Sequence, residues 1–307
     1  MTGPVVVLAG GTGGAKLARG MLDVVGPDSL VVIANTGDDI EIYGGYVSPD
    51  PDLTTFWLAD RIDPRGWGID GDTFNVMEGL RALGVKTWFN LGDQDLAICL
   101  ERARRLQDGE RPTTAQAAIA EALNVGATVL PMCDEPVRTR VMAGDRWWPF
   151  QEYMIKAGGA RAEADAVQDI DYRGARAAKP TPEVRQAIDT AQAIIIGPSN
   201  PAISIGPILA VNGMRAALTE TDAPVVAVSP LVGGEVVKGP TAAFMEFANL
   251  PITSDGIAAY YDPLIAGLVA DQRTQKIPVL ETDVLMDSAE ARRRVAEETL
   301  SFAHALR

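Results

Sequence analysis

A short buried strand followed by a run of glycines is the feature that most constrains the fold of this chain. Residues 5–9 read Val-Val-Val-Leu-Ala, and residues 10–14 read Gly-Gly-Thr-Gly-Gly. Residues 15–25 then have the pattern of a helix, and residues 30–34 form a second short apolar run. This β-loop-α-β beginning predicts an α/β fold with a Rossmann-like, doubly wound, mostly parallel sheet.

The rest of the chain continues the pattern, and we predict a single α/β domain over residues 1–307. A helical insertion is expected over about 53–125, and a β-hairpin over 137–155, with 158–179 irregular. The predicted helices are 53–61, 73–83, 95–107, 114–123, 207–218, one from about 240, and 288–306. The further predicted strands are 128–130, 193–196, 225–229, 267–270 and 277–280.

The composition is that of a globular enzyme with small-molecule partners. Hydrophobic residues make up 47% of the 307 residues, and the net charge of -14 argues against a nucleic-acid partner. The N-terminus lacks a basic segment and no run of about 18 apolar residues exists, so neither a signal peptide nor a membrane span is expected. Two isolated cysteines, Cys99 and Cys133, fit a reducing cytoplasm.

The scarcity of histidine excludes several kinds of chemistry. The single histidine is His304, close to the end of the chain. Ser-His pairs, histidine bases and histidine metal ligands are therefore not expected. Carboxylates, basic side chains, backbone N–H groups and a hard metal ion remain as the groups able to carry a reaction.

The glycine run is a candidate phosphate-binding turn. A strand that enters a helix through glycines presents N–H groups and the positive helix end to an anion. The candidate phosphate contacts are Gly11, Thr12, Gly13, Gly14 and Lys16. Lys16 stands where the dinucleotide fingerprint needs a third glycine, and the P-loop sequence is absent, so neither fingerprint is met. The alternative is a tight strand-to-helix turn without a ligand.

Acidic residues follow the second strand. Asp38 and Asp39 come first, and Asp50 and Asp52 follow within the next segment. They are expected at the same edge of the sheet as the glycine run, where open α/β sheets bind ligands. They could hold Mg²⁺ or take a proton from an attacking hydroxyl group. The alternative is a solvated loop in which Asp52 caps a helix.

A second polar turn follows the strand at 193–196. Residues 197–201 read Gly-Pro-Ser-Asn-Pro, and Ser199 and Asn200 offer groups that suit a nucleotide. A rigid proline-rich turn explains the same residues equally well. Lys238 is a possible phosphate contact or an ordinary surface lysine.

Two further motifs stand out, and the first of them admits two interpretations. Trp67 lies between two glycines, where it has room to stack on a flat ring or to pack in the core. Asp93 and Asp95 lie in a polar turn before a helix, and either residue could simply cap that helix.

Read in order, these motifs resemble the 2-phospho-L-lactate transferase family of coenzyme F420 biosynthesis. The ordered set covers nearly the whole chain and is more specific than any one motif. The segments that carry the resemblance are 10–17, 35–39, 48–52, 67–69, 91–95, 149–152, 197–201, 204–208, 226–230 and 238–240.

The resemblance implies a reaction and its cofactor. A guanosine diphosphate conjugate of a small acid would donate its phospho-acid group to the ribityl hydroxyl of 7,8-didemethyl-8-hydroxy-5-deazariboflavin. GMP would leave, Mg²⁺ would be required, and the protein would be a homodimer. The acid could be lactate, enolpyruvate or glycerate, and no residue chooses among them.

The resemblance also implies roles for individual residues. Asp52 and Asp50 would be catalytic, and Asp52, Asn90 and Trp67 would bind the deazaflavin. The family often has a lysine where this chain has Asn90. Asp38, Asp39 and Asp50 are candidate metal ligands. The donor's diphosphate and guanosine would contact Gly11, Thr12, Gly13, Gly14, Lys16, Ser199 and Asn200.

Two other functions compete with this interpretation. Similar glycine and acidic motifs occur in a related gluconeogenesis-factor group of bacterial regulatory proteins that bind UDP-sugars. The segments 91–95 and 149–152 favour the transferase. An NAD-dependent dehydrogenase is disfavoured by the broken fingerprint and the missing catalytic histidine.

Overall fold

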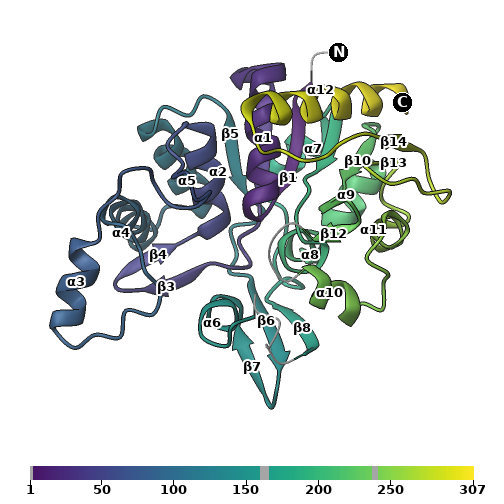
Figure 1. Cartoon of the computed structure of the whole chain (residues 1–307). Coiled ribbons are helices and arrows are strands. Elements are labelled where there is room, and N and C mark those ends of the chain that lie inside the picture. Colours follow the sequence, from purple (N-terminus) through teal and green to yellow (C-terminus); the bar gives the residue numbers. More distant parts are fainter. Residues whose placement is uncertain (1–2, 160–165, 237–240) are drawn as a thin grey trace.

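The computed structural model describes residues 3–159, 166–236 and 241–307, and a seven-stranded parallel sheet forms its centre (Figure 1). The strand order is β14-β13-β10-β9-β1-β2-β5. The strands are β1 (Val5–Ala9), β2 (Leu30–Ala34), β5 (Thr128–Pro131), β9 (Ala193–Ile196), β10 (Val225–Val228), β13 (Gly267–Ala270) and β14 (Val279–Glu281). All neighbouring strands pair in parallel. The predicted α/β fold class is confirmed.

The strand order places a topological switch point beside β1. The chain adds β2 and β5 on one side of β1, then crosses to add β9, β10, β13 and β14 on the other side. This is the order of doubly wound dinucleotide-binding sheets, extended by one strand. The carboxyl ends of β1 and β9 flank the switch point, so the glycine run and residues 197–201 lie next to each other.

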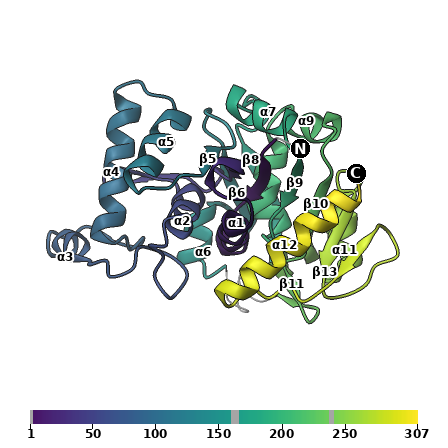
Figure 2. The ribbon, with the colours of Figure 1, turned by 90° about the horizontal axis from the view of Figure 1, so that it is seen from above.

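Helices cover both faces of the sheet because successive strand residues point to opposite sides. Val5 and Val7 join one core with α1 (Gly11–Val25) and α12 (Ala289–Ala305). Val6 and Leu8 join a second core with α7 (Pro182–Asp189), α9 (Met214–Glu220) and α11 (Ser254–Tyr261). The view along the sheet shows α1 and α12 on the face opposite α7 and α9 (Figure 2).

The insertion between β2 and β5 is helical but begins earlier than predicted. A short hairpin of β3 (Ile40–Ile42) and β4 (Gly45–Val47) leads into α2 (Pro49–Leu58). Asp52 lies inside the first turn of α2, and Ser48 occupies the N-cap position, so the predicted cap role of Asp52 is wrong. Pro49 at the first helical position sets this start. The other helices are α3 (Asn75–Ala82), α4 (Asp93–Gln107) and α5 (Pro112–Ala122).

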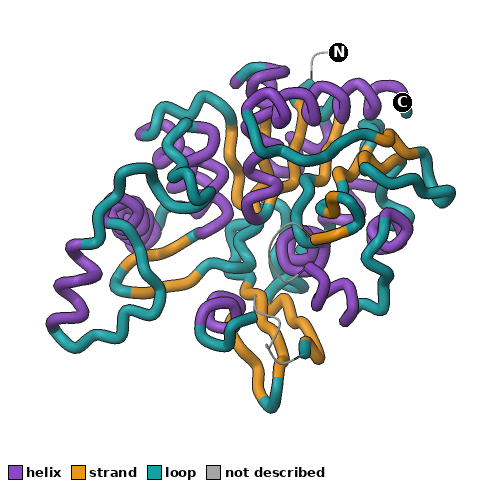
Figure 3. The backbone as a smooth tube through the Cα atoms, in the orientation of Figure 1, coloured by secondary structure: helices purple, strands orange, loops and turns teal. Residues whose placement is uncertain are grey.

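A second, antiparallel sheet lies below the main sheet (Figures 1 and 3). It pairs β7 (Arg146–Pro149) with β6 (Arg138–Ala143), and β6 with β8 (Val167–Arg173). The predicted hairpin is confirmed, but its second strand ends at Pro149. There α6 (Phe150–Ile155) begins and buries Phe150 and Tyr153 against this sheet. The irregular structure predicted for 158–179 is wrong where β8 forms. The sequence did not indicate this strand, because its residues are largely polar and exposed or half-exposed.

The helix predicted at 207–218 is divided into two helices, and a π-helix precedes them. A π-helix (Pro201–Ile205) continues into α8 (Gly206–Ala210), and α9 starts after the left-handed Gly213. No single helix in the described residues is long and apolar enough to span a membrane. Pro201–Ala210 and Met214–Glu220 meet that length and apolar composition only when counted as a pair, and the two parts are bent by 86°. Of the helix predicted from about 240, the structure describes α10 (Thr241–Phe247). Lys238 lies outside the described residues.

The crossing of α1 over α12 depends on one glycine. A Cβ atom at Gly20 would lie 2.3 Å from the Arg292 carbonyl oxygen, a backbone atom of α12. We expect Gly20→Ala to lower the free energy of unfolding by about 1–3 kcal/mol through overpacking. Gly79→Ala is the matched control, because a Cβ atom at this helical glycine meets nothing within 4 Å. Urea unfolding should show Gly79→Ala unchanged or slightly stabilised, and equal behaviour of the two variants would contradict this crossing.

Candidate active site

The carboxylate of Asp50 connects three separate parts of the chain. Its Oδ1 accepts a hydrogen bond from the Gly11 N–H at 2.7 Å, and its Oδ2 accepts one from Asn35 Nδ2 at 2.9 Å. Asp50 lies on α2, Gly11 follows β1 and Asn35 follows β2. The predicted meeting of glycine run and acidic residues at one edge is therefore confirmed. Burial raises the pKa of Asp50 to about 6, although both hydrogen bonds act in the opposite direction.

Two glycines of the run allow α1 to approach the turn that follows β9. A Cβ atom at Gly13 would lie 2.0 Å from the Pro198 carbonyl oxygen, and one at Gly14 would lie 2.8 Å from Ser199 Oγ. Gly11 itself has a positive φ of 64°. Close packing therefore accounts for these glycines without a ligand, and their phosphate-binding role stays a prediction.

The turn after β9 combines a capping residue with an unpaired hydroxyl group. Asn200 Oδ1 accepts hydrogen bonds from the N–H groups of Ala202 and Ile203, which caps the π-helix. The Ser199 hydroxyl is buried and has no hydrogen-bond partner within the described parts of the chain. Ser199, beside Gly14, is therefore better placed than Asn200 to contact a ligand at the switch point.

Lys16 lies one turn further along α1 than the glycines. Its Nζ is 5.9 Å from the ring centroid of Trp57 on α2. The side chain thus extends along the contact between α1 and α2. The predicted phosphate contact of Lys16 would require a ligand that reaches this side of the helix.

Asp38 and Asp39 are also buried, and Asp38 lies close enough to Asp50 to feel its charge. Burial, together with the charges of Asp50 and Asp39, raises the pKa of Asp38 well above its usual value. Its Oδ1 has no hydrogen-bond partner in the described structure. Burial also raises the pKa of Asp39 to about 7, against the opposing charge of Arg138. Asp39 Oδ1 accepts a hydrogen bond from Ser48 Oγ at 2.7 Å.

Arg102 holds Asp52, and nothing in the sequence pattern singles it out. Its Nη1 donates to Asp52 Oδ2 at 3.0 Å and its Nη2 donates to Asp52 Oδ1. Nη1 also contacts the Tyr46 carbonyl oxygen at 3.1 Å, and Nη2 contacts Gln116 Oε1 at 3.2 Å. Arg102 lies in the run Glu-Arg-Ala-Arg-Arg, which resembles a solvated helix face, but only 3% of Arg102 is exposed.

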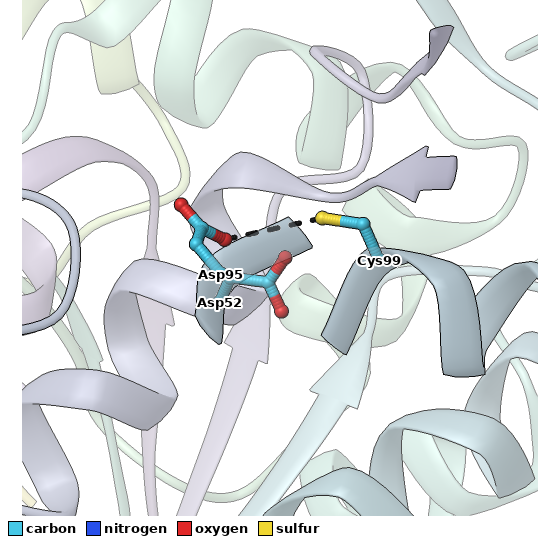
Figure 4. A group of neighbouring side chains, drawn as sticks. All are labelled: Asp52, Asp95 and Cys99. Carbon is cyan, nitrogen blue, oxygen red and sulfur yellow. Dashed lines mark hydrogen bonds between the residues drawn. The ribbon is translucent and has the colours of Figure 1, made fainter. Parts of the chain in front are cut away.

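Asp95 and Cys99 on α4 complete this cluster (Figure 4). With Asp52 they are the one described group of three metal-ligand-type side chains whose ligand atoms lie within 4.8 Å of one another. Burial, and the charges of Asp52 and Asp72, raise the pKa of Asp95 to about 7. The guanidinium of Arg102 already supplies the cation here, so we interpret the cluster as an ion-pair network.

A pocket of about 380 Å³ opens beside this network. Its walls include four aromatic side chains and four carboxylates, together with Arg65, Asn90 and Gln151. The structure therefore brings Asp50, Asp52, Asn90 and Trp67 to one cavity. Asn90 Oδ1 accepts a hydrogen bond from Arg81 at 2.7 Å, and 57% of Trp67 is exposed at the cavity. The aromatic residues are Phe56, Trp67, Phe74 and Phe89, and the carboxylates are Asp50, Asp52, Asp72 and Asp95.

The polar turn at 91–95 connects the N-termini of α3 and α4 through side-chain hydrogen bonds. Asp93 accepts hydrogen bonds from the N–H groups of Asn75 and Val76, so it caps α3 rather than its own helix α4. Its hydrogen bonds, the one from the Thr73 hydroxyl first, lower the pKa of Asp93 to about 2. Asp72 in turn accepts from the N–H groups of Gln94 and Asp95 and caps α4. The predicted cap role of Asp93 or Asp95 for α4 is therefore wrong, because Asp93 caps α3 and Asp72 supplies the cap of α4.

The doubly wound sheet and the acidic, aromatic pocket beside α2 define an α/β enzyme with a small-molecule site. The chain belongs to the family described as 2-phospho-L-lactate transferase CofD, whose model matches residues 5–300. The protein is thus a CofD-type transferase.

Named relatives support this assignment over nearly the whole chain. A 2-phospho-L-lactate transferase of Methanosarcina mazei is 34% identical over 95% of this chain and 98% of its own length. A phosphoenolpyruvate transferase of Kitasatospora aureofaciens is 37% identical over 99% and 98%. A solved structure of a UPF0052 family member from Bacillus halodurans shares the fold, with a TM-score of 0.56 and 19% identity over 90% of this chain and 83% of that chain.

The Arg102–Asp52 pair should behave as a buried charge pair. Arg102→Gln leaves the Asp52 carboxylate buried without its cation, so we expect a loss of about 3–5 kcal/mol in the free energy of unfolding. The double variant Arg102→Gln/Asp52→Asn should recover much of this loss, because no charge is left unpaired. Urea unfolding of both single variants and the double variant measures the coupling. Strictly additive losses would contradict a direct pair.

The raised pKa of Asp95 predicts a dependence of stability on pH. Because the folded-state pKa is about 7 and the ordinary value is 3.8, folding binds a proton between these pH values. Proton binding by Asp95 therefore stabilises the folded state at low pH, and this contribution is lost as the pH rises through 7. Asp95→Asn cannot titrate, so its unfolding free energy should fall less steeply and exceed that of the wild type by about 1–3 kcal/mol at pH 8. Parallel curves for the two proteins from pH 5 to 8 would contradict this assignment.

Proposed function

We propose that this transferase moves a phospho-acid group from a guanosine diphosphate conjugate to the ribityl hydroxyl of 7,8-didemethyl-8-hydroxy-5-deazariboflavin, and releases GMP. The group would be 2-phospholactate, phosphoenolpyruvate or phosphoglycerate. The names of the relatives support the first two. The observation that carries the proposal is the position of Asp52. Asp52 lines the aromatic pocket and lies on the same turn of α2 as Asp50, whose carboxylate accepts a hydrogen bond from Gly11 of the glycine run.

The pocket suits a flat ring that carries a polar chain. Phe56, Phe74 and Phe89 offer apolar walls, and Trp67 can stack from the exposed side. We assign Asp52 to the ribityl hydroxyl. Each carboxylate oxygen has two lone pairs, so Asp52 can accept a substrate hydrogen bond while Arg102 holds it in place.

In the proposed step, the ribityl oxygen attacks the phosphorus atom next to the small acid. A new P–O bond forms, the bond to the bridging oxygen breaks, and GMP leaves with that electron pair. Asp52 takes the hydroxyl proton as general base. Positioning of the two substrates and neutralisation of charge on phosphate supply most of the remaining acceleration.

We propose that Asp38, Asp39 and Asp50 supply oxygen ligands for a Mg²⁺ ion. Asp38, Asp39 and Asp50 offer only oxygen atoms, which Mg²⁺ prefers, and Asp38 Oδ1 is buried without a partner. Burial, together with the charges of Asp50 and Asp39, raises the pKa of Asp38, and a bound cation would offset this cost of the ionised form. When bound, Mg²⁺ would neutralise charge on the donor's phosphates. Asp38, Asp39 and Asp50 would hold it next to the α1 N-terminus.

An assay of GMP release tests this proposal directly. Purified protein is incubated with Mg²⁺, the deazaflavin and, in turn, the lactate, enolpyruvate and glycerate conjugates of guanosine diphosphate. We expect GMP and the matching phosphodiester product with at least one donor. Asp52→Asn should lower kcat by about 10²–10⁴, the usual contribution of a general base.

The matched control is Asp145→Asn, the same substitution at an exposed position in the β6–β7 turn. It should keep wild-type activity, and circular dichroism of both variants checks that they fold. Full activity of Asp52→Asn would remove Asp52 from the mechanism. No GMP release with any donor, together with thermal stabilisation by UDP-N-acetylglucosamine but not by GDP, would favour the regulatory alternative instead.

A further inference from the structure

The pocket assigned to the acceptor is acidic, although the phosphorylated donor that must meet the acceptor there is an anion. Among the described residues that line it, four are carboxylates and Arg65 is the one basic residue. Two other cations nearby are committed to protein contacts. The guanidinium of Arg102 binds Asp52 with both terminal nitrogens, and Lys16 lies against Trp57. Arg65 is therefore the described cation of this cavity that an anionic substrate can contact.

The loop that carries Arg65 touches both halves of the site. Its base is closed by a bridge between Ile62 and Ile69 and by the hydrogen bond from the Asp63 N–H to the Gly68 carbonyl oxygen at 3.1 Å. At its tip, a Cβ atom on Gly66 would lie 3.7 Å from Thr12 Cγ2 at the start of α1. The tip therefore stands between the glycine run and the pocket.

Two glycines give this tip its shape. Gly66 and Gly68 have positive φ values of 92° and 74°, a conformation that side chains with a Cβ atom rarely adopt. They flank Trp67, which lines the pocket. Arg65 and Trp67 thus lie two residues apart on one tip, with the glycine run on one side and the aromatic pocket on the other.

Arg65 has a partner that a substrate can replace. Its Nε donates to Asp63 Oδ1 at 2.7 Å, and its Nη2 donates to Asp63 Oδ2 at 3.1 Å. The pair lies within the loop, and 57% of the Arg65 side chain is exposed. Exposed pairs of this kind are weak because water screens both charges. The planar guanidinium binds the paired oxygens of phosphate or carboxylate in the same two-point manner.

We propose that Arg65 exchanges Asp63 for an oxyanion of the bound donor, and so acts as its recognition residue at the junction of the two subsites. The oxyanion is a phosphate oxygen pair or the carboxylate of the transferred acid. This inference rests on the proposed function.

The experiment compares the two partners of the ion pair. Arg65→Gln removes the cation, and we expect the donor KM to rise 10- to 100-fold, with Arg65→Lys recovering part of the loss. Asp63→Asn breaks the same pair but leaves the guanidinium available, and its amide oxygen can still accept from the Arg65 N–H. The donor KM of Asp63→Asn should stay at or below the wild-type value. A purely structural role of the pair predicts equal defects in both variants, and this result would overturn the proposal.

Calorimetric binding of GDP and of each donor conjugate, without acceptor, separates this inference from the proposed function. Weaker binding of GDP and conjugate alike in Arg65→Gln assigns Arg65 to the phosphates. Weaker binding of the conjugate alone assigns it to the carboxylate. Either result supports the proposal even if no GMP is released. Unchanged binding of both ligands in Arg65→Gln, or no binding of either ligand to the wild type, would overturn it.

Discussion

The hydrogen bonds of Asp50 to Gly11 and Asn35 are the contacts on which the candidate site depends. They place a carboxylate of α2 at the N-terminus of α1, where N–H groups and the helix dipole favour an anion. The same contacts tie the ends of β1 and β2 to the helical insertion. Without them, α2 would lose its direct hydrogen bonds to the residues that follow β1 and β2.

Two carboxylates on one helix turn thereby acquire different environments. Asp50 faces the glycine run and the buried Asp38, whereas Asp52 is held by the guanidinium of Arg102 and lines the aromatic pocket. In the proposed function, this division separates the donor side of the site from the acceptor side. The loop with Arg65 and Trp67 also lies beside the start of α1 and lines the pocket.

Sequence patterns predicted the parallel sheet well because its strands are short, apolar and buried on both faces. They failed where a residue's neighbours decide its state. Residues 150–155 look like a continued strand, yet Phe150 and Tyr153 pack as one helix face on the small sheet. Asp52 looks like a cap, but Pro49 starts the helix earlier. Asp93 has the sequence of a cap for α4, and only the fold directs it to α3.

The sequence by itself determined the fold class, the candidate acidic residues, the glycine run and the family resemblance, because each rests on a local pattern or an ordered set of motifs. Only the tertiary structure decided which charges meet. Arg102 and Asp52 are 50 positions apart, and Gly11 and Asp50 are 39 apart. Burial removes water from these groups and makes each depend on a distant partner, which no local pattern records. The chemistry assigned to each carboxylate is therefore a property of the folded chain.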